Sequence, residues 1–312
     1  NLEMRSLVFL IVTGLLFYSC NSNISKVNNG EIIRIDSFPS KFVSPRNIDI
    51  WIPSNYSSDS LYAVMYMHDG QMLYDSSKTW NKQEWGVDEV ISNLQNKRLI
   101  QNCIVVGIWN SGPGRHSDYF PQKPFEQLDI RFQDSLLNNV NRNSSEGLFY
   151  NGIQSDNYLK FLVEELKPYV DKNFQTKPDL DNTFVCGSSM GGLISMYAIC
   201  EYPNVFGGAA CLSTHWIGTF SADNNPIPES FATYLSNNLP GSNNHKLYFD
   251  YGTETLDALY EPFQLKIDSV IKTAGYDQNN WLTLRFDGHD HSENSWRKRL
   301  DIPFEFLLRI NN

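Results

Sequence analysis

The chain has 312 residues, of which 41% are hydrophobic and 13% aromatic, and its formal net charge at pH 7 is −10. Once an apolar amino-terminal segment is set aside, about 280 residues remain, which is enough for one large core without a second domain. The acidic balance excludes the basic surface that contact with a phosphate backbone requires, so we expect no nucleic-acid partner.

The first twenty residues predict an export signal of the bacterial lipoprotein type. After Met4-Arg5, the apolar run 7–17 is too short for a stable membrane span. Cys20 follows a small residue at the end of this run, as in a loose lipobox, which predicts a signal peptide over 1–20 and lipidation of Cys20. We expect the lipid to anchor a periplasmic or outer-membrane protein to the membrane. An uncleaved anchor and a secreted protein are the alternatives.

The rest of the chain divides into a short tether and one domain. Residues 1–3 precede the methionine and are interpreted as an upstream extension. The Asn- and Ser-rich residues 21–30 are predicted to be a flexible tether. Residues 31–312 are predicted to form a single domain.

Apolar runs and amphipathic runs alternate along this domain. We predict strands at 32–36, 46–52, 62–67, 103–108, 183–187, 208–213, 246–251 and 281–286, and helices at 87–97, 155–173, 190–201, 262–274 and 296–309. This alternation favours an α/β domain with a mainly parallel central sheet and helices on both faces. Pro168 predicts a kink or a break in its helix. The stretches 109–154 and 214–245 have no predicted element, and we expect such long loops to select the substrate.

The residues Gly187-Ser-Ser189-Met-Gly191 lie between an apolar run, 183–186, and a helical run, 193–200. In a strand-turn-helix of this kind, GxSxG places the central serine on a strained turn, and the glycines remove the β-carbons that would clash. This context predicts that Ser189 is a nucleophile at the edge of a cleft. A plain turn rich in glycine and serine is the alternative.

A serine nucleophile needs a base, an acid that orients the base, and an oxyanion hole. The acid candidates Glu254 and Asp257 and the base candidates His289 and His291 each follow a predicted strand, in the order serine, acid, histidine. Loops at the carboxyl ends of strands are where open α/β sheets build their sites. Either acid also suits the cap of the helix that follows.

The segment His68-Asp-Gly-Gln71 follows another predicted strand, and its glycine allows the backbone to turn. The backbone N–H groups of Gln71 and Met190 are therefore the candidate oxyanion donors.

Several motifs in one order resemble the putative esterase family of α/β-hydrolases, which includes esterase D, enterochelin esterases, bacterial feruloyl esterases and mycobacterial mycolyltransferases. The resemblance extends from about Ile32 to the end of the chain. It is carried by the segments 68–71, 85–88, 105–108, 119–121, 187–192 and 252–253, with Arg115, His291 and Trp296. It implies an α/β-hydrolase fold over 31–312 and a serine carboxylic-ester hydrolase with a Ser-His-Asp triad and an acyl-enzyme intermediate.

The resemblance also chooses among the candidates for base and acid. In relatives the catalytic histidine precedes a tryptophan by five residues, a spacing that His291 keeps with Trp296 and that His289 does not. The acid stands at varying offsets after the Gly-Thr pair, so Asp257 is favoured and Glu254 remains the alternative. Relatives carry an arginine near the site, and Arg115 either binds a substrate carboxylate or, as we favour, orders its own loop.

Aromatic side chains in loops suit stacking on sugar or phenolic rings, and Trp80, Trp85 and Trp109 are of this type. Together with Arg115, the substrate-binding candidates are Trp85, His215 and Trp216. His215 and Trp216 follow the predicted strand 208–213, which we expect to end beside the turn that carries Ser189. The alternative is that these two residues form a turn with a packed tryptophan.

We expect no metal and no cofactor, because His289, Asp290 and His291 alternate in direction and no ligand pair at helical spacing supports them. Four cysteines, at positions 103, 186, 200 and 211, fall in apolar segments and are predicted to be buried free thiols. A disulfide between Cys186 and Cys211, on neighbouring predicted strands, is the alternative.

The expected substrates are carbohydrate acyl esters, with acetyl or feruloyl groups, or siderophore esters. The alternatives are an acyltransferase of the mycolyltransferase type and a catalytically silent binding protein. Fold alone does not decide among these substrates.

Overall fold

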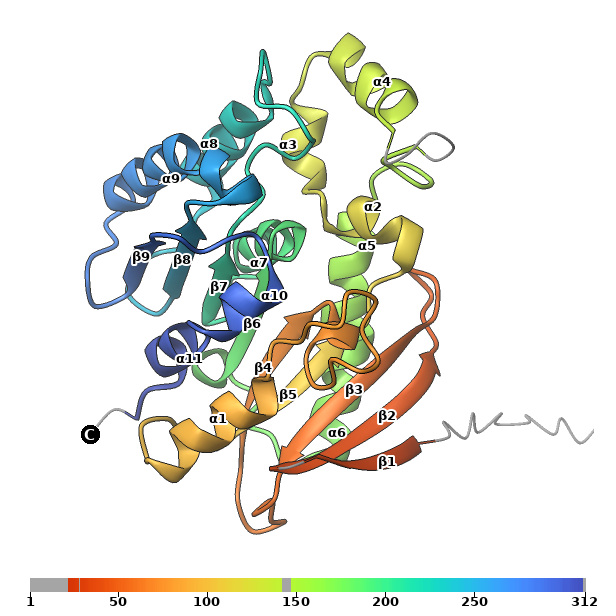
Figure 1. Cartoon of the computed structure of the whole chain (residues 1–312), viewed down its shortest axis with the longest axis vertical. Helices are drawn as coiled ribbons and strands as arrows, with labels where there is room; N and C mark the ends of the chain where they lie inside the picture. Colours follow the sequence, from red (N-terminus) through yellow and green to blue (C-terminus); the bar gives the residue numbers. More distant parts are fainter. Residues whose placement is uncertain (1–21, 28, 142–146, 311–312) are drawn as a thin grey trace, which may run out of the picture.

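The computed structural model describes residues 22–27, 29–141 and 147–310, which form one α/β domain (Figure 1). The predicted signal peptide and the predicted lipidation site at Cys20 lie outside the described residues and stay predictions. Within the described part of the chain, no helix is long and apolar enough to cross a membrane.

The core of the domain is a nine-stranded sheet with the strand order β1-β2-β3-β5-β4-β6-β7-β8-β9. The strands are β1 Ser22–Val27, β2 Gly30–Phe38, β3 Arg46–Pro53, β4 Ala63–His68, β5 Cys103–Ile108, β6 Thr183–Ser188, β7 Gly208–Leu212, β8 Lys246–Gly252 and β9 Trp281–Phe286. From β5 to β9 all neighbours are parallel, whereas β1, β2 and β3 join the edge antiparallel. The predicted fold class is confirmed.

The first strand differs from the sequence prediction. Residues 21–30 are not a tether throughout, because Ser22–Val27 pair antiparallel with β2 and place Ile24 opposite Ile33. An edge strand such as β2 presents unpaired backbone groups that a preceding segment can satisfy.

Two hydrophobic layers cover the sheet, and alternate strand residues enter each layer. In β4, Val64 and Tyr66 belong to one layer, whereas Met65 and Met67 belong to the other. Such alternation follows from the two-residue period of a strand, and a strand buried on both faces is apolar throughout.

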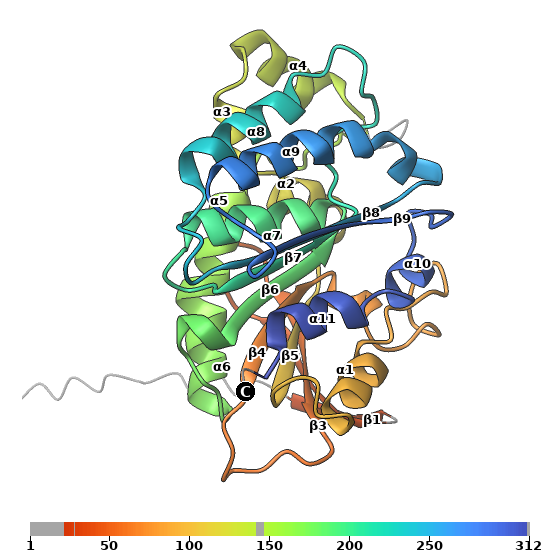
Figure 2. The same cartoon turned by 90° about the vertical axis from the view of Figure 1, so that its left-hand side faces the viewer.

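The α-helices are α1 Val87–Asn96, α2 Arg115–Tyr119, α3 Gln122–Glu126, α4 Ile130–Asn139, α5 Ser155–Lys160, α6 Lys167–Asn173, α7 Met190–Glu201, α8 Ile227–Asn238, α9 Glu261–Thr273, α10 Glu293–Arg297 and α11 Asp301–Leu308. Short helical turns are η1 Gly70–Met72, η2 Gly112–Gly114, η3 Phe161–Leu166, η4 Leu180–Asn182 and η5 Thr255–Leu259. The helices α5, α6 and α7 lie on one face of the sheet, and α1 and α11 lie on the other (Figure 1 and Figure 2).

The two stretches without predicted elements are partly helical. Residues 109–154 contain α2, α3 and α4, and 214–245 contain α8. The buried residues Ile227, Phe231, Tyr234 and Leu235 of α8 recur at helical spacing, a signal that the sequence carries.

Two predicted helices are not regular α-helices along their whole length. The helix over 155–173 is helical throughout, but a π-type turn, η3, precedes Pro168. Proline removes one N–H donor and crowds the carbonyl four residues earlier, and the wider turn relieves both. The predicted helix 296–309 is divided into α10 and α11.

Cys103, Cys186, Cys200 and Cys211 are free and buried, so Cys186 and Cys211 are not joined although their strands are neighbours. Burial raises the pKa of the Cys103 thiol to about 12, which keeps this thiol protonated.

Candidate active site

The turn between β6 and α7 holds Ser189 in a strained conformation. Its backbone has φ 57° and ψ −120°, outside the regions that a non-glycine residue ordinarily adopts. A β-carbon on Gly187 would lie 2.7 Å from the backbone of Gly191, so the turn closes only with glycine there. Ser189 N–H donates to the Leu212 carbonyl at 2.9 Å, which fixes the turn against β7.

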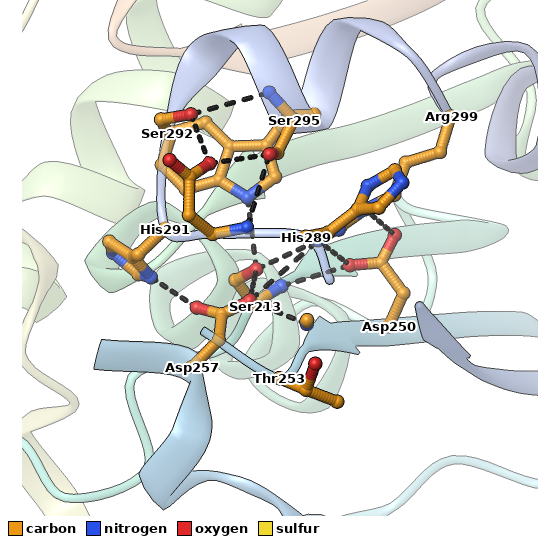
Figure 3. A network of polar contacts seen from close by, with 12 residues as sticks. Ser213, Asp250, Thr253, Asp257, His289, His291, Ser292, Ser295 and Arg299 are labelled. Atoms are coloured by element: carbon orange, nitrogen blue, oxygen red, sulfur yellow. Dashed lines mark hydrogen bonds and ion pairs between the residues drawn. The ribbon is translucent and has the colours of Figure 1, made fainter. Parts of the chain in front are cut away.

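Asp257 and His291 contact each other (Figure 3), and His291 lines the same cavity as Ser189. Asp257 Oδ1 accepts a hydrogen bond from His291 Nδ1 at 2.5 Å, and the Asp257 side chain is fully buried. The bond to Nδ1 leaves Nε2 of His291 as the ring nitrogen available to a substrate or nucleophile. Glu254, the alternative acid, is exposed, and its backbone N–H bonds the His289 carbonyl at 3.0 Å.

The second oxygen of Asp257 is held by two donors from separate strands. Gly252 N–H at the end of β8 and Ser213 Oγ after β7 each lie 2.6 Å from Asp257 Oδ2. The Ser213 hydroxyl in turn accepts hydrogen bonds from Trp296 Nε1 and Arg299 Nη2, both at 2.9 Å. A hydroxyl can donate one hydrogen bond and accept two, so the hydrogen-bonding capacity of the Ser213 hydroxyl is filled.

Arg299 connects this acid to a second buried carboxylate (Figure 3). Its Nη2 lies 2.8 Å from Asp250 Oδ1 and 3.9 Å from Asp257 Oδ2. Burial raises the pKa of Asp250, and the Arg299 guanidinium opposes this rise. A buried arginine between two buried carboxylates leaves neither acid without a positive partner.

The two predicted oxyanion donors, Gln71 and Met190, each lie in a helical segment, and Gln71 lines the same cavity as Ser189. Met190 begins α7, where the N–H groups of the first turn have no intrahelical acceptor. Gln71 lies in η1, which follows Asp69 in the left-handed region at φ 57°. A β-carbon on Gly70 would lie 2.5 Å from the backbone of Gly107, so glycine allows η1 to pack against β5.

A cavity of about 590 Å³ opens onto Ser189 and His291. Its lining also includes Asp69, Gln71, Met72, Trp80, Asn81, Gln83, Trp85, Asn110, Arg115, Ser188, Ser292, Glu293 and Trp296. Arg115 is fixed there by two hydrogen bonds of 2.7 Å to the Asp69 side chain, which tie α2 to the turn before Gln71 rather than to the backbone of its own loop. Trp85 is buried and packs on Trp296, with ring centroids 5.3 Å apart.

The structure places two other predicted substrate residues elsewhere. Trp216 lies in the core, where its Nε1 donates to Gln264 Oε1 at 2.8 Å. His215 is buried behind Ser189 and donates its backbone N–H to the Ser189 carbonyl at 3.2 Å. Neither residue lines the cavity.

Sequence reasoning did not find Ser213, Asp250 and Arg299. A charged residue inside the predicted strand 246–251 is a signal for Asp250, since a carboxylate there needs a buried partner. The sequence does not say which cation supplies it. In the described part of the chain, no group of three or more His, Cys, Asp or Glu side chains is arranged to hold a metal ion.

Comparison with known sequences finds esterases and uncharacterized proteins. The model of a protein family described as putative esterase matches residues 137–305. Uncharacterized protein YbbA of Bacillus subtilis is 26% identical over 173 residues, which are 55% of this chain and 58% of that protein. An endo-1,4-beta-xylanase/feruloyl esterase of Xylanibacter ruminicola is 26% identical over 204 residues, which are 63% of this chain and 23% of that protein. The chain thus spans less than two thirds of the length of these relatives.

Solved esterase structures share the fold. A ferulic acid esterase has a TM-score of 0.60 and 15% identity, covering 90% of this chain and 98% of its own. A ferulic acid esterase of Anaeromyces mucronatus, in complex with ferulic acid, has a TM-score of 0.59 and 16% identity, covering 90% and 93%. Enterochelin esterase of Shigella flexneri has a TM-score of 0.57 and 15% identity, covering 88% and 57%. At these identities the likeness shows that the chain has the α/β-hydrolase fold.

The two acid candidates are separable by amide substitution. We expect Asp257→Asn to lower kcat for a p-nitrophenyl ester by about three to four orders of magnitude, because an amide no longer holds the required histidine tautomer. Glu254→Gln is the matched control and should keep kcat near the wild-type value. A larger loss in the Glu254 variant would reverse the assignment.

Removing the Ser213 hydroxyl tests the support of the acid. We expect Ser213→Ala to lower kcat about tenfold with little change in KM, because Asp257 loses one donor while Trp296 and Arg299 lose an acceptor. Ser230→Ala is the control, since the buried Ser230 hydroxyl donates to the Ile227 carbonyl within α8. Equal kcat values for the two variants would contradict a role of Ser213 in positioning Asp257.

Proposed function

Because the chain belongs to the putative esterase family, whose model matches more than half of it, we propose that it hydrolyses carboxylic esters through an acyl-enzyme on Ser189. The observation that carries this proposal is the contact of 2.5 Å between Asp257 and His291 beside a strained serine that opens onto the same cavity as His291. Nucleophile, base and orienting acid are the three groups that such chemistry requires.

In the proposed reaction, His291 Nε2 accepts the Ser189 proton as Oγ bonds to the ester carbonyl carbon. Asp257 keeps the imidazole oriented and stabilises its positive charge. The N–H groups of Gln71 and Met190 bind the oxyanion, and His291 returns the proton to the alcohol as the carbonyl–alcohol bond breaks. Water then attacks the acyl-enzyme by the same route and releases the acid.

We propose that the alcohol part of the substrate is a saccharide. Trp80 lines the cavity and is 84% exposed, so its indole face is available at the rim. Asn81 Nδ2 donates to Glu293 Oε2 at 2.8 Å beside it, which places amide and carboxylate groups next to an aromatic surface. An apolar ring face next to hydrogen-bonding groups suits a sugar, which has both kinds of surface. The name of one relative, endo-1,4-beta-xylanase/feruloyl esterase, agrees with this substrate class because it joins a polysaccharide hydrolase to a feruloyl esterase.

The role of the nucleophile is tested with Ser189→Ala. We expect kcat for p-nitrophenyl acetate to fall by at least about three orders of magnitude, because members of a triad act as one unit. A fluorophosphonate probe should label the wild-type protein at Ser189 and leave the variant unlabelled. Wild-type turnover by the variant would reject the proposal, and absence of labelling in the wild type would indicate a silent binding protein.

The saccharide proposal is tested with Trp80→Ala. We expect kcat/KM for an acetylated or feruloylated xylo-oligosaccharide to fall about tenfold, a loss of about 1.4 kcal/mol in transition-state binding. Turnover of p-nitrophenyl acetate, which has no sugar to stack, should stay near the wild-type rate. Trp109→Ala is the control, because Trp109 lines a different cavity and packs under Arg34. Equal losses on both substrates would contradict the proposal.

A further inference from the structure

A second cavity, which we call the η2 cavity, lies across the turn η2 from the cavity that holds Ser189. Its volume is about 680 Å³, compared with about 590 Å³ for the active-site cavity. Asn110 and Arg115 line the active-site cavity, whereas Ser111 and Gly114, which lie between them in the chain, line the η2 cavity. One short helical turn, Gly112–Gly114, therefore separates the two cavities.

A buried ion pair forms the floor of the η2 cavity. Arg46 Nη1, at the start of β3, lies 3.2 Å from Asp118 Oδ2 in α2, and both residues are buried. Ser111 Oγ, which precedes η2, donates to the same carboxylate oxygen at 2.7 Å. On the core side, the Arg46 guanidinium carbon lies 5.2 Å from the ring centroid of Tyr158. These contacts join β3, η2 and α2, so the walls of the cavity are held in place before any ligand binds.

The rim of the η2 cavity carries an aromatic ring on a fixed backbone. Tyr150 lines the cavity and is 61% exposed. Its carbonyl accepts a hydrogen bond of 2.8 Å from Ser117 Oγ, and the Gln154 N–H donates to the Ser117 carbonyl at 2.9 Å. The segment is thus held to α2 at both ends while the phenol ring stays at the surface. The amide side chains of Asn151 and Gln154 also line the cavity, so a ring face lies beside hydrogen-bonding groups.

The short helix α2 fixes the position of the η2 cavity relative to the active site. Its first residue, Arg115, donates two hydrogen bonds to Asp69, which lines the active-site cavity. Ser117 and Asp118 follow in the same helix and hold the rim and the floor of the η2 cavity. Because a helix keeps its residues at constant spacing, one ligand can occupy both cavities without a rearrangement of the protein.

We propose that the η2 cavity is a second subsite, in which a distal sugar unit of the ester substrate stacks on Tyr150. The substrate is accordingly an oligosaccharide or polysaccharide ester, whose chain crosses η2 from the active-site cavity. This inference rests on the proposed function, because it extends the saccharide that we assign to the active-site cavity. More than half of the residues that line the η2 cavity come from 109–154, a stretch that the sequence predicts to select the substrate.

The test is the dependence of kcat/KM on the length of the sugar chain. The two substrates are feruloylated xylobiose and feruloylated xylohexaose, esterified at the same position of the terminal sugar. We expect the wild type to prefer the longer substrate, because only this chain reaches Tyr150. Tyr150→Ala should lower the ratio of kcat/KM for the longer substrate to that for the shorter one about fivefold, since the stacking surface is lost.

Two variants serve as controls. Tyr150→Phe keeps the aromatic ring and should keep the wild-type ratio. Phe220→Ala removes a ring that is also 61% exposed but lines a different cavity, so it should leave the ratio unchanged. Binding of unesterified xylohexaose, measured by calorimetry, gives a readout that does not depend on ester hydrolysis. We expect Tyr150→Ala to weaken this binding about fivefold and Phe220→Ala to leave it unchanged.

A wild type without preference for the longer substrate would overturn the inference, and so would equal ratios in the wild type and Tyr150→Ala. Turnover of p-nitrophenyl acetate and fluorophosphonate labelling of Ser189 separate these outcomes from failure of the proposed function. If the wild type is labelled and active but shows no effect of chain length, only the second subsite fails. If it is neither labelled nor active and still binds xylohexaose through Tyr150, the esterase chemistry fails and the sugar site stands.

Discussion

The arrangement of the site depends on how the buried Asp257 carboxylate is satisfied. An ionised carboxylate without exposed surface is costly unless hydrogen bonds and a positive charge replace the water it loses. Asp257 receives three donors, from His291, Gly252 and Ser213, which come from three separate carboxyl-terminal loops of the sheet. Satisfying one acid therefore fixes the relative positions of the β7, β8 and β9 ends.

The same constraint explains the local sequence around the acid. A β-carbon on Gly252 would lie 2.1 Å from the His289 carbonyl oxygen, so only glycine lets the two loops approach. That carbonyl accepts the N–H groups of Thr253 and Glu254, each at 3.0 Å. Backbone hydrogen bonds thus join the loop that carries His291 to the loop that carries Asp257. The contact between the Asp257 and His291 side chains forms between two segments that the backbone already holds together.

Those parts of the fold that depend on local pattern were predictable. Every predicted strand is present, and the elbow at Ser189 was predicted because its strain is built from neighbours in sequence. The tether prediction over 21–30 was wrong in part, because β1 forms only by pairing with β2. Strand pairing depends on the tertiary structure, so the composition of the segment alone does not predict it.

The site shows the same division between local and tertiary information. His291 was chosen by its spacing to Trp296, whereas spacing left both Glu254 and Asp257 open. The turn η5 separates these acids by turning Asp257 inward while Glu254 stays at the surface. Trp216 was expected at the substrate because it follows β7, yet its ring turns into the core. Side-chain direction after a strand depends on which space the neighbouring layer leaves free.

The buried charges behind the acid have a consequence for the proposed chemistry. Asp250 and Asp257 are both fully buried, and Arg299 is the cation between them, so the three side chains together carry one negative charge when both acids are ionised. In a low-dielectric environment this excess attracts a positive charge more strongly than it would in water. The proposed reaction creates such a charge on His291 as Ser189 loses its proton, 2.5 Å from Asp257. The cluster is neutral with the imidazolium present, so the fixed charges favour the transition state over the resting enzyme, which is the condition for electrostatic catalysis.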